Sequence, residues 1–149
     1  MEGERPGGCG CPPTTGSGVG GVHHVFLTVN DLKRSRDFYQ ALMPRLGYPE
    51  FFDYGTVLGW ASPGGSFWLK EADRRHMRES FSKDRVGLCE VAFRAASREQ
   101  VDGLALDVPK WGGALLHLPR EYPEYVAGYY AVFFTDPDGI KLELVYLPG

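Results

Sequence analysis

The chain has 149 residues, of which 43% are hydrophobic and 23% are charged, and this composition fits one globular domain with a core of its own. Its formal net charge of −3 provides no basic field for nucleic acid or for an anionic membrane surface. No apolar run approaches the roughly 18 residues of a membrane-spanning helix, so a transmembrane segment is excluded.

The first 20 residues predict a disordered tail. They are rich in Gly and Pro, and apart from Met1 and Val19 they hold no large hydrophobic residue that could offset the entropy cost of ordering. The apolar segment of a secretory signal is absent from them. The three cysteines, Cys9, Cys11 and Cys89, are too few for a disulfide framework, and we expect a cytoplasmic location. Cys9 and Cys11 alone fall short of the four ligands of a structural zinc site.

The pattern changes to a period of two at residue 22. Residues 22–29 predict a strand with His24, Phe26 and Thr28 on one face. A helix follows, which begins after Asn30 or Asp31 as the capping residue and ends at Gly47. Three short β-like runs complete the unit, at 48–54, 56–61 and 66–70, with turn sequences between them. The order of this unit is therefore β-α-β-β-β.

The same order recurs after a polar connector at about 72–86. A strand is expected at 87–94 and a helix at 97–108, with Ser97 as its N-cap and Gln100 three residues on. Three more strands are expected at 114–118, 128–134 and 140–147, the last two joined by an Asp-Pro-Asp-Gly turn.

We therefore predict an α+β fold of two tandem βαβββ modules, at about 21–71 and 87–147, within one domain over 21–149. The simplest packing places the helices outside and lets two curved sheets face each other around a cup.

Three side chains on the expected strands are of metal-ligand type: His24, Glu90 and Glu143. One imidazole and two carboxylates suit a divalent ion such as Mn²⁺, Fe²⁺, Zn²⁺ or Ni²⁺, and a carboxylate within an apolar strand is costly unless it is paired or bound to metal. Other interpretations remain open. His24 could be a hydrogen-bonded core histidine, Glu90 could pair with Arg94 or Lys141, and Glu143 could be a satisfied buried acid or face solvent.

Aromatic side chains supply most of the candidates for the wall of a substrate pocket, which would suit a flat or drug-sized ligand. Each ring could serve core packing instead. The candidates are Phe26, Trp60, Trp68, Arg94, Tyr125, Tyr129, Tyr130 and Phe134. The segment 119–128 could gate the cup or be a plain surface loop, and His76 and His117 lie outside the expected face pattern.

Two stretches of the sequence carry a resemblance to a known family. Residues 24–32 (HVFLTVNDL), followed by SRDFY at 35–39 and LG at 46–47, resemble the opening of the vicinal oxygen chelate superfamily. This superfamily includes glyoxalase I, extradiol dioxygenases, fosfomycin-resistance transferases and bleomycin-resistance proteins. Residues 133–145 (FFTDPDGIKLELV) are similar to its closing hairpin, and 90–94 to the strand that opens its second module. The resemblance covers about residues 21–147.

The resemblance implies a metal site with His24 and Glu143 as ligands. Glu90 stands where many relatives have His, and its added negative charge favours harder ions. As an alternative to ligation, Glu90 would act as the proton-moving base. The stretch near 67–69, which supplies a fourth ligand in glyoxalase I, holds no ligand here, and this weakens a glyoxalase I assignment.

The resemblance also implies a homodimer that acts on a small molecule. The first candidate is a metal-dependent enzyme whose substrate chelates the ion through two neighbouring oxygens, in lyase, isomerase or dioxygenase chemistry. The alternative is a metal-free protein of the bleomycin-resistance type, which binds and sequesters a small aromatic compound or antibiotic.

Overall fold

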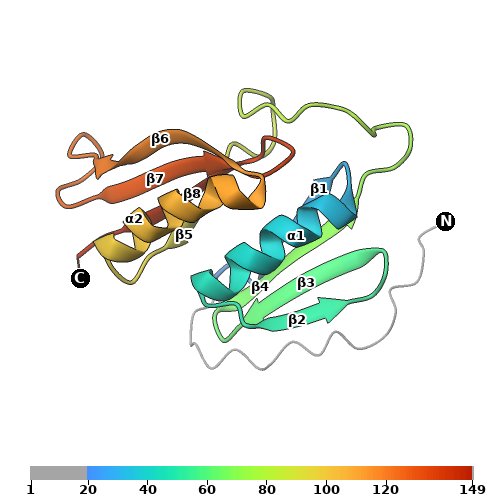
Figure 1. The fold of residues 1–149 in the computed structure, drawn as a ribbon, viewed down its shortest axis with the longest axis horizontal. Helices are drawn as coiled ribbons and strands as arrows, with labels where there is room; N and C mark the ends of the chain where they lie inside the picture. Colours follow the sequence, from blue (N-terminus) through green and yellow to red (C-terminus); the bar gives the residue numbers. More distant parts are fainter. Residues whose placement is uncertain (1–19, 149) are drawn as a thin grey trace.

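The computed structural model describes residues 20–148, so nearly all of the predicted tail, including Cys9 and Cys11, lies outside the described residues. Two βαβββ units follow one another, as predicted (Figure 1). The first contains β1 (His24–Val29), α1 (Leu32–Leu42), η1 (Met43–Leu46), β2 (Glu50–Asp53), β3 (Val57–Ser62) and β4 (Gly65–Glu71). The second contains β5 (Val91–Arg94), α2 (Arg98–Asp107), η2 (Val108–Trp111), β6 (Ala114–Glu121), β7 (Tyr130–Thr135) and β8 (Lys141–Tyr146).

Both helices begin at the predicted caps and the first ends at the predicted Gly47, whereas the second continues past the expected residue 108 in a 3₁₀ segment that ends at Gly112. The side chains of Asp31 and Ser97 each accept a hydrogen bond from the backbone N–H three residues on, which satisfies a free donor of the first turn. Each helix then tightens into the short 3₁₀ segment η1 or η2. These segments end at Gly47 and Gly112, whose φ angles of 87° and 92° lie in the left-handed region that favours glycine.

The two sheets have the same topology, with strand orders β1-β4-β3-β2 and β5-β8-β7-β6. In each sheet the first and last strands of the module pair in parallel, and the other neighbours pair antiparallel. β5 begins at Val91, later than the expected residue 87. Its parallel partner β8 begins at Lys141, opposite Glu90, so no ladder is available to the residues before Glu90. Glu90 therefore lies just before its strand.

The helix-covered sides of both sheets contribute to one hydrophobic core. Phe67 of the first module and Phe93 of the second lie in it with ring centroids 5.8 Å apart, and α1 and α2 lie on the same side of the molecule in Figure 1. The modules of one chain thus meet through their helix-covered sides. The face of each sheet that points away from this core is called here its open face.

Three predicted pocket residues lie in this core or pack against it, instead of lying on an open face. Trp60 and Phe134 are fully buried, and Trp60 packs against Phe51 and Tyr39. Tyr130 faces α2, where its hydroxyl donates to Asp102 (2.6 Å). The prediction that Trp60 and Phe134 line a pocket was wrong, because the middles of β3 and β7 are covered on both faces and show no alternation of polar and apolar residues. No helix within residues 20–148 is long and apolar enough to cross a membrane.

Candidate functional site

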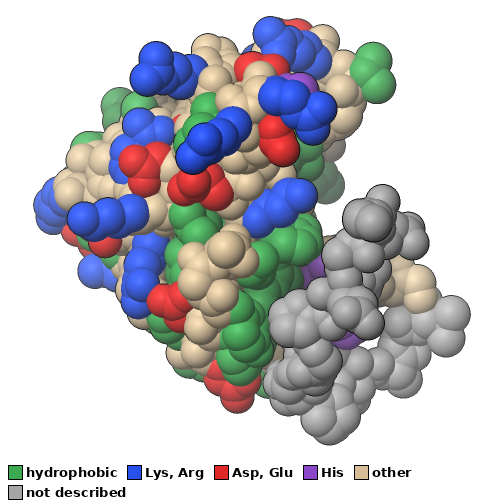
Figure 2. All heavy atoms as spheres, turned by 90° about the vertical axis from the view of Figure 1, so that its right-hand side faces the viewer, with side chains coloured by type: hydrophobic (Ala, Val, Ile, Leu, Met, Phe, Trp, Pro, Cys, Tyr) green, Lys and Arg blue, Asp and Glu red, His purple; other side chains and the backbone are tan. Residues whose placement is uncertain are grey.

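The open face of the first module carries two of the predicted pocket residues, Phe26 and Trp68, which are register partners on β1 and β4. The Trp68 indole lies flat over Gly59, where an added Cβ would come within 2.2 Å of the ring. Phe52 and Tyr54 stack beside it, with ring centroids 5.9 and 6.3 Å away. Figure 2 views the molecule from the side of the first module and shows hydrophobic side chains gathered in its lower half, beneath a more charged upper half. This face offers aromatic surface.

His24 lies on the same open face, at the start of β1. Its side chain is exposed, and its Nδ1 lies 3.0 Å from Nδ1 of the neighbouring His23. The two imidazoles therefore hydrogen-bond to each other, with one ring nitrogen protonated and the other not.

The open face of the second module carries the two predicted carboxylates and a lysine. The Lys141 ammonium forms an ion pair with Glu90 (2.7 Å) and lies 4.6 Å from the centroid of the Phe133 ring. Glu143 is only 2% exposed, and it accepts a hydrogen bond from the Tyr129 hydroxyl (2.5 Å). Two of the alternatives raised by the sequence are thus realised: Glu90 pairs with Lys141, and Glu143 is a satisfied buried acid.

The burial of Glu143 changes its acidity. Burial raises the pKa of Glu143 above its ordinary value, the Tyr129 hydrogen bond opposes this rise, and the negative charge of Glu90 adds to it. Burial and the hydrogen bond to Glu143 also raise the pKa of Tyr129, so its phenol stays protonated and remains a donor. At this site a carboxyl with a raised pKa, Glu143, therefore lies beside a phenol that stays protonated, Tyr129.

Four aromatic rings pack together next to Glu143 and are called here the tyrosine cluster: Tyr122, Tyr125, Tyr129 and Phe133. Tyr122 and Tyr125 stack with centroids 5.5 Å apart and planes 6° apart. Tyr129 meets both edge-on, and Phe133 meets Tyr122 edge-on. Tyr125 is 61% exposed, so one ring of the cluster is available to a ligand.

The loop after β6 is shaped by this cluster. Tyr122 is buried, and within the described part of the chain its hydroxyl has no hydrogen-bond partner. Arg120 lies over its ring, 3.7 Å from the centroid. The loop expected at 119–128 is therefore shorter, because β6 runs on to Glu121, and it packs onto the sheet through its own tyrosines.

Four residues of this face were not predicted as site residues: Lys141, Phe133, Tyr122 and His117. His117 lies opposite Phe133 in the register of β6 and β7, with ring centroids 6.0 Å apart. Residues two apart on a strand share a face, and this places Lys141 on the side of β8 that carries Glu143, where the sequence offered it only as a pairing partner of Glu90. The predicted residue Arg94 is exposed and lies opposite Val145 on the same sheet.

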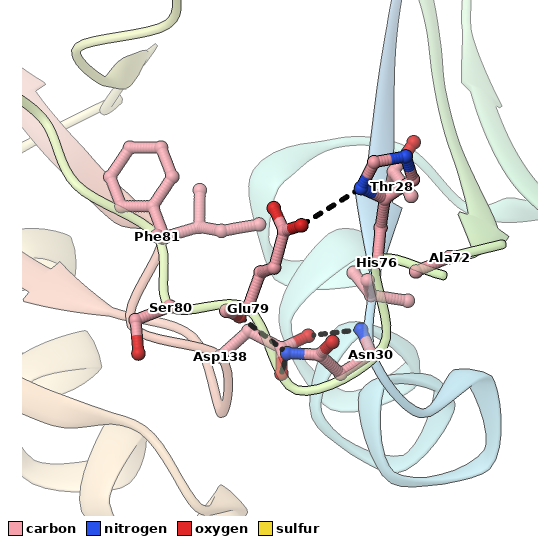
Figure 3. A pocket seen from close by; sticks show the side chains of 10 residues that line it. Thr28, Asn30, Ala72, His76, Glu79, Ser80, Phe81 and Asp138 are labelled. Carbon is pink, nitrogen blue, oxygen red and sulfur yellow. Dashed lines mark hydrogen bonds and ion pairs between the residues drawn. The ribbon is translucent and has the colours of Figure 1, made fainter. Parts of the chain in front are cut away.

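A cavity of about 210 Å³ opens where the connector crosses between the modules (Figure 3). In it Nδ1 of His76 lies 2.8 Å from a Glu79 carboxylate oxygen, and this pair raises the pKa of the exposed His76 imidazole. The cavity is lined by Thr28, Val29, Asn30, Ala72, His76, Glu79, Ser80, Phe81, Asp138 and Ile140.

Asn30 joins the connector to both modules at this cavity. Its side-chain amide donates to the Glu79 carbonyl (3.0 Å) and to Asp138 (3.2 Å), and its carbonyl oxygen accepts from the backbone N–H of Arg78 (2.7 Å). Asp138 also pairs with Arg34 (2.5 Å). The polar groups of Asn30 and Asp138 are therefore used in holding the connector.

The predicted metal ligands do not come together within one chain. His24 lies on the first module beside His23, whereas Glu90 and Glu143 lie on the second with Lys141 and Tyr129. Among residues 20–148, no three His, Cys, Asp or Glu side chains lie close enough to share one metal ion. A three-ligand centre is thus not formed by the described residues of a single copy.

Comparisons with known proteins match this architecture. The family model of the Glyoxalase/Bleomycin resistance protein/Dioxygenase superfamily matches residues 21–144. The Bacillus subtilis (strain 168) protein YqjT, described as uncharacterized, is 34% identical over 124 residues, which are 83% of this chain and 97% of YqjT.

Two solved structures illustrate the shared fold. A glyoxalase/bleomycin resistance protein from Albidiferax ferrireducens T118 superimposes with a TM-score of 0.72 at 26% identity, over 85% of this chain and 98% of that one. A glyoxylase/bleomycin resistance protein/dioxygenase domain from Frankia sp. EAN1pec gives a TM-score of 0.69 at 27% identity, over 88% and 100%. With its two βαβββ modules and the match over most of its length, the chain belongs to the Glyoxalase/Bleomycin resistance protein/Dioxygenase superfamily.

Proposed function

We propose that the protein binds a small planar organic molecule on the open face of the second module, without a metal ion. The observation that carries this proposal is the position of the Glu143–Tyr129 pair beside the partly exposed tyrosine cluster. Aromatic rings stack favourably on flat ligands, and a small number of fixed polar groups sets their orientation.

In this proposal the tyrosines and Glu143 have different roles in ligand binding. The exposed Tyr125 ring stacks on the ligand, and the stacked Tyr122 behind it keeps that ring in place. Glu143 uses Oε1 for the Tyr129 hydroxyl, which leaves Oε2 to accept an N–H or O–H of the ligand. A hydrogen bond to a buried carboxylate is stronger than one between neutral groups, so this contact selects the orientation of the ligand.

Calorimetric titration with a panel of planar aromatic compounds, in buffer with EDTA, tests the proposal. We expect micromolar binding by at least one compound, and about tenfold weaker binding to Tyr129→Phe, because the variant leaves Glu143 without its donor. Tyr130→Phe is the matched control, since Tyr130 faces α2 and loses a hydrogen bond of similar length there. Equal affinities of the two variants, or no binding across the panel, would contradict the proposal.

A second candidate is the metal-dependent enzyme that the sequence favours, and one observation supports it. His24 and Glu90 lie at similar places in the two modules: His24 is the first residue of β1 and Glu90 immediately precedes β5, and each is followed by Val and then a residue of the open face. Both open faces lie outside the shared core, so a homodimer could bring His24 of one copy to Glu90 and Glu143 of another. A bound metal ion would act there as a Lewis acid toward an oxygen-chelating substrate.

Elemental analysis of protein purified without chelators separates the two candidates. The second candidate predicts close to one equivalent of a divalent metal in the wild-type protein and its loss in His24→Ala. His76→Ala is the control, because His76 lies at the connector cavity. Negligible metal in all three proteins would exclude the second candidate and leave the first.

A further inference from the structure

Lys141 occupies an unusual position on the open face of the second module. It projects from β8 on the same side as Glu143, two residues on, and it stands next to Glu90 across the parallel β5–β8 pair. Its ammonium is 2.7 Å from Glu90 Oε2 and lies over the Phe133 ring. Phe133 is itself the register partner of Glu143. The ammonium therefore lies beside the Glu90 carboxylate and over an aromatic face, on the side of the sheet that also carries Glu143.

A divalent cation bound by Glu90 Oε2 would compete with this ammonium for the same oxygen. Two nearby carboxylates repel each other, and a positive charge beside them relieves the repulsion. The Lys141 side chain is only 20% exposed, so its ammonium is held close to Glu90 by the surrounding strands. A metal ion would have to displace it from Glu90 and then lie next to a second positive charge, which weakens binding further.

We infer that the Lys141 ammonium prevents divalent metal ions from binding to Glu90 and Glu143, and that it donates hydrogen bonds to the ligand instead. An ammonium has three N–H donors, and the ion pair with Glu90 is close without meeting hydrogen-bond geometry, since Glu90 Oε2 has no hydrogen-bond partner among the described residues. These donors suit a carbonyl, phenolate or carboxylate oxygen of a planar molecule stacked on the tyrosine cluster. The part of this inference that concerns the ligand rests on the proposed metal-free function. The test below measures metal binding and requires no ligand.

The test is a titration of the metal-free protein with MnCl₂, followed by electron paramagnetic resonance of the unbound ion. We expect no saturable binding that depends on Glu90 in the wild-type protein. Lys141→Met removes the charge, keeps an apolar stem over Phe133, and is expected to bind Mn²⁺ at least about tenfold more tightly. Adding Glu90→Gln to Lys141→Met should abolish the gain, because it removes one of the two carboxylates.

Two matched variants complete the design. Lys141→Arg keeps the positive charge and should exclude Mn²⁺ as the wild-type protein does. Lys70→Met removes an exposed lysine from the equivalent sheet of the first module, opposite Thr28, and should change nothing. Circular dichroism checks that each variant is folded, and Lys141→Gln replaces Lys141→Met if the latter is not.

Two results would overturn the inference. One is wild-type protein that already binds Mn²⁺ as tightly as Lys141→Met, and the other is a folded Lys141→Met without any gain. Failure of the proposed function is a separate result, namely that no planar compound binds in EDTA, and it leaves the metal titration interpretable.

Discussion

Gly113→Ala should destabilise the protein by about 3 kcal/mol in the free energy of unfolding. A Cβ at Gly113 would lie 2.5 Å from the backbone carbonyl oxygen of Thr135, 2.7 Å from the Phe38 ring and 2.8 Å from Val108. These atoms belong to β7, α1 and η2, so no single flexible side chain can move aside to make room.

A second glycine provides the control for this prediction. Gly103 lies within α2, and no atom lies within 4 Å of an added Cβ. Gly103→Ala should therefore stabilise the protein by about 0.5–1 kcal/mol, because alanine loses less backbone entropy in a helix. Urea unfolding of both variants measures the effect. If Gly113→Ala lowers the free energy of unfolding by no more than about 0.5 kcal/mol, the prediction is wrong and the junction of α1, η2 and β7 can rearrange.

Asp136 should make the stability of the protein depend on pH between 4 and 7. The residue is 2% exposed, and burial raises its pKa to about 6, although Oδ1 accepts from the backbone N–H groups of Asp138 and Ile140 and Oδ2 from the Tyr39 hydroxyl. A carboxyl whose pKa is higher in the folded than in the unfolded state binds its proton more tightly when folded. Its contribution is therefore complete below pH 4 and is lost as the pH rises through 6.

The shift of about two pH units corresponds to about 3 kcal/mol between pH 4 and pH 7. Asp136→Asn cannot ionise, so the difference in unfolding free energy between wild type and variant should fall by about this amount as the pH rises. Other groups titrate equally in both proteins and cancel in the difference. Urea unfolding at four pH values measures it, and two parallel pH curves would refute the assignment to Asp136.

The helix boundaries were predictable from local sequence. Asp31 and Ser97 cap helices because their side chains reach the free N–H groups of the first turn, and Gly47 ends α1 and η1 because it tolerates a positive φ. Strand ends were less predictable. β5 is short because its partner β8 begins only at Lys141, and that limit lies about 50 residues away in the sequence.

The candidate site was predicted in part. Period-two alternation placed His24 and Phe26 on one face of β1 correctly. It could not separate Trp60 from Trp68, because β3 and β4 are buried on both sides over most of their length, and the residues next to each tryptophan within its strand are apolar and mark no face. The register between strands decides that Trp68 lies with Phe26 on the open face.

The sequence by itself determined the tandem βαβββ order, the helix caps and the residue types available for chemistry, because these depend on contacts within a few residues along the chain. Only the tertiary structure decided which of these residues meet. The ion pair of Glu90 with Lys141, the hydrogen bond of Tyr129 to Glu143 and the separation of His24 from both depend on strand register and on how the modules pack. Burial and neighbouring charge then set the acidity of Glu143, and both arise only when distant segments come together.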